Sequence, residues 1–121
     1  MNDILLYVGS GVIIAWGIAH IIPTKSVVGG FGSASMDNKR IITMEWIAEG
    51  LALCFVGLLV TAIGDSGNNV SDIVYQSSAA MLFVMAVLTL LTGSRTSIIP
   101  IRICPFVKTS VAILFLLGSL L

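Results

Sequence analysis

The chain has 121 residues, of which 57% are hydrophobic and 10% charged, and its mean hydropathy is +1.08. This composition is too apolar for a water-soluble domain and too regularly patterned for a disordered one. Six basic and six acidic residues leave no net charge, and we expect no nucleic acid among its partners. The composition predicts an integral membrane protein whose first partner is the lipid bilayer.

Four continuous apolar runs make up most of the sequence and belong to a single predicted domain. Each run has roughly the 20 residues that a helix needs to cross a hydrocarbon core of about 30 Å. The alternation of apolar and polar residues that marks barrel strands does not occur in them. We therefore predict an all-α protein, an integral membrane antiparallel four-helix bundle. Its spans are expected at about 4–22, 38–63, 71–91 and 104–121.

The connections between the runs carry further signals. Asp37 precedes the second run and is expected to cap its helix, because a carboxylate accepts hydrogen bonds from the free N–H groups of a first helical turn. The fourth run is expected to begin beside Pro105. The first connection is rich in glycine and serine over residues 27–35, and we consider it a candidate lid over a site at that end.

All six basic residues fall in or beside the first and third connections, which lie on the same side of a four-span chain. They are Lys25, Lys39, Arg40, Arg95, Arg102 and Lys108. The positive-inside rule predicts that this side is cytoplasmic and that both termini of this multi-pass protein face outward from the cell membrane. An inner basic rim that contacts lipid phosphates is expected from Lys25, Lys39, Arg40, Arg95 and Arg102.

Two acidic residues interrupt the second apolar run. Glu45 and Glu49 are four residues apart, so they lie one turn apart on the same face of a helix. A charge in hydrocarbon is costly unless it is paired, protonated or hydrated, and such residues usually mark a functional site. Counted from a helix start near residue 38, Glu45 is expected close to the cytoplasmic headgroups and Glu49 one turn deeper.

His20 is the partner that we expect for these acids. It lies at the cytoplasmic end of the first run, and because consecutive spans run in opposite directions, His20 and Glu45 should arrive at similar depth. An imidazole bonded to a carboxylate in a site of low dielectric constant can hold or pass a proton. Trp16 and Trp46 are expected to flank the pair. The predicted ligand or proton site comprises His20, Glu45, Glu49, Trp16 and Trp46.

Several functions are compatible with such a site. The first is a binding or transport bundle, as a homodimer or a single copy, for a proton, a cation or a small amphipathic ligand. The second is an intramembrane enzyme that acts on a lipid-like or quinone-like substrate. The third is an accessory subunit of a larger membrane complex. In a simpler interpretation, His20 and Glu45 only satisfy each other, and Arg95 or Arg102 neutralises an acid.

The sequence identifies no cofactor and predicts no metal site, and it leaves open whether the protein is an enzyme. A single histidine makes bis-histidine haem ligation within one chain impossible. The common zinc-protease, serine-hydrolase and iron–sulfur motifs do not occur. The two cysteines, Cys54 and Cys104, are expected at different depths and are not expected to form a disulfide.

Short segments of the chain resemble a group of small, uncharacterised prokaryotic four-span membrane proteins. The segments are 17–20, 23–25, 37–40 and 44–50. In span number and size the chain also resembles DoxX-like membrane proteins, which implies a four-helix bundle and an association with membrane redox or quinone chemistry. Length and span count are similar to those of the small multidrug resistance transporters as well. Those transporters carry their membrane glutamate in the first span, where this chain has none.

Overall fold

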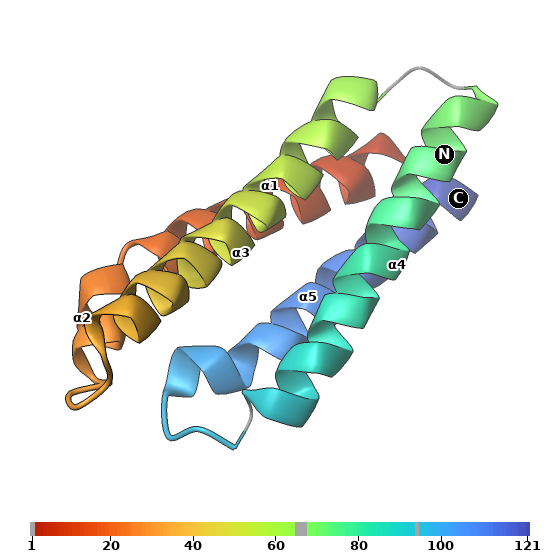
Figure 1. Cartoon of the computed structure of the whole chain (residues 1–121). Helices are drawn as coiled ribbons and strands as arrows, with labels where there is room; N and C mark the ends of the chain where they lie inside the picture. The colour runs from red at the N-terminus through yellow and green to blue at the C-terminus, as the bar shows by residue number, and fades with distance from the viewer. Residues whose placement is uncertain (1, 65–67, 94) are drawn as a thin grey trace.

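The computed structural model describes residues 2–64, 68–93 and 95–121, and over these ranges the chain is helical with no strand (Figure 1). The prediction of an all-α protein is confirmed. Four of the helices are long and apolar enough to cross a membrane, which suggests a multi-pass membrane protein. In chain order the helices are α1 (Asp3–Ile21), α2 (Thr24–Gly29), α3 (Met36–Ile63), α4 (Asn69–Thr92) and α5 (Ile99–Leu120).

Two helix starts differ from those expected. Ser35 caps α3, because its side chain accepts a hydrogen bond of 3.1 Å from the backbone N–H of Asn38; the prediction of Asp37 as the cap was wrong. Helix α5 begins five residues before the predicted 104. Pro100 lies in its first turn, where a missing N–H removes no helical hydrogen bond, and Pro105 lies inside the helix.

The long helices associate mainly as two pairs. Helix α1 packs along α3 and α4 packs along α5, while α1 also contacts α5 and holds the pairs together (Figure 1). Helices α3 and α4 touch over a short stretch only. The backbone N–H of Asn2 donates to the carbonyl of Gly118 at 2.7 Å, so the two ends of the chain lie together at one end of the bundle.

Glycines bring α1 and α3 close together. A Cβ atom added at Gly17 would lie 2.7 Å from the carbonyl oxygen of Gly50, and one added at Gly57 would lie 2.5 Å from a side-chain carbon of Ile14. A side chain at either position would therefore separate the two backbones, as at the small-residue contacts of membrane helices. The contact fixes how far α1 is shifted along α3.

A tightly packed apolar core fills the bundle on the side of the chain termini. Its most enclosed members come from all four long helices and are at most 1% exposed. They include Leu6, Ile13, Leu53, Leu82, Val111 and Phe115. His20, Glu49, Thr89 and Lys108 follow this core toward the end of the bundle that carries α2.

Candidate functional site

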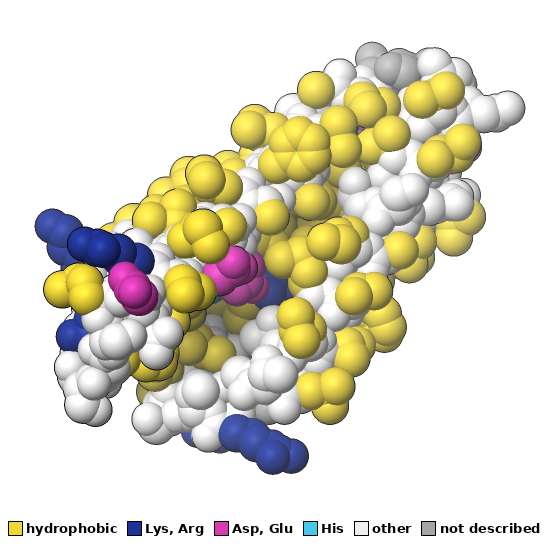
Figure 2. Space-filling model, in the orientation of Figure 1, with side chains coloured by type: hydrophobic (Ala, Val, Ile, Leu, Met, Phe, Trp, Pro, Cys, Tyr) yellow, Lys and Arg dark blue, Asp and Glu magenta, His cyan; other side chains and the backbone are white. Residues whose placement is uncertain are grey.

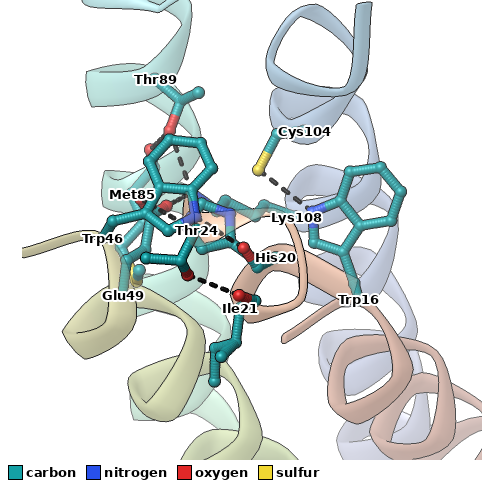
Figure 3. A network of polar contacts seen from close by, with 10 residues as sticks. All are labelled: Trp16, His20, Ile21, Thr24, Trp46, Glu49, Met85, Thr89, Cys104 and Lys108. Carbon is teal, nitrogen blue, oxygen red and sulfur yellow. Dashed lines mark hydrogen bonds and ion pairs between the residues drawn. The ribbon is translucent and has the colours of Figure 1, made fainter. Parts of the chain in front are cut away.

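Each of the four long helices contributes one side chain to a polar network near the α2 end of the bundle (Figure 3). Lys108 of α5 forms an ion pair with Oε1 of Glu49 on α3 and donates a hydrogen bond of 3.0 Å to Oγ1 of Thr89 on α4. The Lys108 side chain is 0% exposed, whereas that of Glu49 is 32% exposed. A buried ammonium group needs such a partner, because its charge has lost its hydration.

His20 of α1 completes the network from the other side of the carboxylate. Its Nε2 lies 3.6 Å from Oε2 of Glu49 and is buried, with no hydrogen-bond partner among the described residues. Trp46 stacks on the imidazole, with ring centroids 4.1 Å apart and an interplanar angle of 16°. The indole N–H of Trp46 also donates to the backbone carbonyl of His20 at 2.6 Å. Trp46 therefore holds His20 beside Glu49.

The structure brings His20 to Glu49 rather than to Glu45, so the expected His20–Glu45 pair is not formed. Because Gly17 packs on Gly50, His20 arrives beside Trp46 and the deeper of the two acids. Glu45 is exposed and forms no ion pair within the described ranges. Of the predicted site residues, His20, Glu49 and Trp46 lie together.

Trp16 lies apart from that cluster, on another wall of the same cavity. Its indole N–H donates to Sγ of Cys104 on α5 at 3.2 Å (Figure 3). Cys104 and Cys54 are both free thiols, as expected. Trp16 thus connects α1 to the first half of α5, opposite the Trp46 side of His20.

Sequence reasoning missed Lys108 and Thr89. Lys108 was grouped with the basic residues beside the third connection, but it lies inside α5 and is fully buried. A single base within the apolar run 104–121 was the signal that could have identified it, as a counter-ion for an acid in another span. Thr89 carried no such signal, since a threonine in an apolar helix usually bonds its own backbone.

A cavity of about 690 Å³ adjoins the network. Trp16, His20, Trp46 and Glu49 line it, and residues of α2 and of the start of α5 line it toward the end of the bundle. The glycine- and serine-rich connection considered as a lid therefore contributes wall residues, Val27 among them. Cavities for small molecules typically have volumes of about 300–1,000 Å³ and apolar walls with a few polar groups.

A second cavity, of about 520 Å³, lies between α3 and α4, and we call it the α3–α4 groove. Figure 2 shows a hollow at this side, with acidic side chains at its edge and a basic side chain deeper inside. Four residues line both the groove and the first cavity, so the two spaces are adjacent. They are Trp46, Glu49, Thr89 and Ile101.

The five residues expected to form a basic rim lie outside both cavities. Lys25, Arg40, Arg95 and Arg102 are exposed and Lys39 is partly buried. Basic side chains gather at the α2 end of the bundle in Figure 2, and Arg40 pairs with Asp37 at 3.8 Å. No ion pair joins Arg95 or Arg102 to an acid within the part of the chain that the structure describes. The base that neutralises Glu49 is Lys108.

Comparison of the chain with protein-family models, with curated proteins and with solved structures finds no match. The chemistry of the site is therefore argued from its geometry. A carboxylate whose charge is already compensated, an unpartnered imidazole nitrogen and two indole rings border a mainly apolar cavity. Such a wall offers hydrogen bonds at one corner and van der Waals contact elsewhere.

Proposed function

We propose that the protein is a membrane-embedded, antiparallel four-helix bundle that binds a small amphipathic molecule in the cavity beside Glu49. Both termini face outward and the basic end is cytoplasmic in this proposal, following the positive-inside rule. The observation that carries it is the cavity of about 690 Å³, with apolar walls and a polar corner formed by His20 and Glu49. The apolar part of a ligand would contact the walls, and its polar group would bond at that corner.

The ion pair argues for an amphipathic ligand over a metal ion or an organic cation. Lys108 already compensates the charge of Glu49, and its own side chain is completely enclosed. A cation that took Glu49 would leave the Lys108 ammonium buried without a counter-ion, which is strongly unfavourable. An uncharged polar group can bond the second carboxylate oxygen or the His20 imidazole without breaking the pair.

Intrinsic fluorescence provides a direct test, because the chain has two tryptophans and both line the cavity. The purified protein in lipid nanodiscs would be titrated with lipophilic alcohols, phenols, quinones and amines. We expect a saturable change in tryptophan emission for the uncharged compounds and none for the amines, which are organic cations at neutral pH. The variants Trp16→Phe and Trp46→Phe would then show that each indole reports the same binding event.

Two phenylalanine substitutions on α1, one inside the cavity and one outside it, test the place of binding. Ala19 is exposed and lines the cavity, so a phenyl ring there should fill part of it and weaken binding about tenfold or more. Ala15 is one turn away on the same helix, is also exposed and lines neither cavity, so Ala15→Phe should bind like the wild type. The proposal is wrong if no compound gives a saturable change, or if the two variants behave alike.

A further inference from the structure

The α3–α4 groove leads from the surface of the bundle to the polar corner of the cavity. Glu45 of α3 and Thr96, just after α4, line its outer part at the end of the bundle that carries α2. Glu49 and Thr89 line its deeper part, where the groove and the cavity share their walls. The sides of the groove are apolar, with Leu88 61% exposed. In a membrane this groove faces lipid.

The hydrogen-bond donors along the groove are already used within the protein. The hydroxyls of Thr89, Thr92 and Thr96 donate to the backbone carbonyls of Met85, Leu88 and Gly93 at 2.7–2.8 Å. The indole N–H of Trp46 donates to His20. No lysine or arginine is found among the described residues of the groove wall. The groove therefore presents hydrogen-bond acceptors to a ligand, foremost the two carboxylates.

We propose that the α3–α4 groove is a lateral entrance through which neutral amphiphiles with a hydroxyl head pass from the bilayer to the cavity. This inference rests on the proposed membrane-embedded binding function. A hydroxyl group donates to Glu45 and then to Glu49 while its alkyl chain stays in hydrocarbon along the apolar sides. A carboxylate or phosphate head meets the uncompensated negative charge of Glu45 and no free donor on the groove wall, and is rejected.

Quenching of Trp46 tests the entrance, since Trp46 lines both the groove and the cavity. The Trp16→Phe variant, with Trp46 as its remaining tryptophan, would be placed in nanodiscs of neutral phospholipid. A long-chain alcohol with a terminal bromine and the carboxylate of the same chain length would be added at equal membrane content. Bromine quenches an indole on contact. We expect the alcohol to be roughly tenfold more effective than the carboxylate, because of like-charge repulsion.

A charge reversal at the groove should reverse this preference. Glu45→Lys places a donor and a positive charge at the outer part of the groove, so the carboxylate should become the better quencher. Asp37→Lys makes the same change in net charge at an exposed position of the same helix outside both cavities. That control should retain the wild-type preference for the alcohol.

The outcomes separate the entrance from the binding function. Equal quenching by both head groups, or the same behaviour of Glu45→Lys and Asp37→Lys, overturns the donor-selective entrance. In that case saturable quenching by the alcohol that is lost in Ala19→Phe still supports the cavity as a binding site. If neither compound gives saturable quenching, the binding function and the entrance are both wrong.

Discussion

Helix α3 meets α1 on one side and α4 on the other, and the two contacts are built in opposite ways. Toward α1, glycines such as Gly17 and Gly50 allow the backbones to approach closely. Toward α4, the helices touch over a short stretch and leave the groove beside Glu49. The comparison teaches that one helix can be firmly positioned on one side while a groove remains along the other.

The two sides depend on each other through Trp46 and Glu49. The close α1 contact places His20 under the indole ring of Trp46, and the stacked pair forms one wall of the cavity. On the open side, Lys108 reaches Glu49 from α5 and links the α1–α3 pair to the α4–α5 pair. Breaking the ion pair and breaking the glycine contact should therefore lower the free energy of unfolding by different amounts.

The largest effect is expected from the ion pair on the open side. Glu49→Gln leaves the Lys108 ammonium enclosed without its counter-ion, and should lower the free energy of unfolding by about 3 kcal/mol. Lys108→Met should cost less, because Glu49 is 32% exposed and keeps part of its hydration. Equilibrium unfolding in mixed micelles with increasing denaturing detergent measures both changes.

The double variant Glu49→Gln with Lys108→Met is the control for this asymmetry. It removes both charges, so it should recover much of the stability lost in Glu49→Gln alone. If Glu49→Gln unfolds like the wild type, or if the two single losses add in the double variant, the ion pair does not stabilise the open side.

A smaller loss is expected at the glycine contact. A Cβ at Gly17 would lie 2.7 Å from the Gly50 carbonyl oxygen and 3.0 Å from the Cys54 backbone nitrogen, so Gly17→Ala must move α1 away from α3. We expect a loss of about 2 kcal/mol, together with a changed Trp46 emission as its stacking on His20 is disturbed.

Gly11→Ala is the matched control on the same helix. A Cβ added at Gly11 meets no atom within 4 Å, so the substitution should be neutral, or slightly stabilising through its better helix propensity. The same unfolding measurement applies. Equal losses in Gly11→Ala and Gly17→Ala would mean that the close contact with α3 does not govern the stability of this side.

The sequence predicts the four long helices well because an apolar run in a bilayer must satisfy its backbone hydrogen bonds internally. It also identifies His20 and Glu49, since polar side chains in such runs are rare. The choice between Glu45 and Glu49 as the neighbour of His20 was wrong, because it depends on a shift of one helical turn. That shift is set by the Gly17–Gly50 contact, which hydropathy does not report.

Lys108 was missed for a related reason. With Pro105 read as the beginning of the last helix, Lys108 falls in a first turn near the membrane surface, where a base needs no partner. With the helix beginning at Ile99, it lies more than two turns inside and needs one. The α3–α4 groove was not predictable at all, since it depends on which helices pair.

The smallest effect is expected at Thr89, which reaches the ion pair from α4. Its hydroxyl accepts from Lys108 at 3.0 Å, so the isosteric change Thr89→Val removes one acceptor from a buried ammonium and should cost about 1 kcal/mol. Thr92 is one turn away on the same helix, exposed, and bonded only to the carbonyl of Leu88 within the described ranges.

Thr92→Val should therefore leave the free energy of unfolding unchanged. Comparing the two variants separates the effect of the hydrogen bond to Lys108 from the effect of removing any threonine hydroxyl from α4. A double-mutant cycle sharpens it further. In a Lys108→Met background, Thr89→Val should become nearly neutral, because the donor that made the hydroxyl necessary has gone. If Thr89→Val costs the same with and without the lysine, α4 does not support the ion pair, and the open side of α3 is held by Glu49 and Lys108 alone.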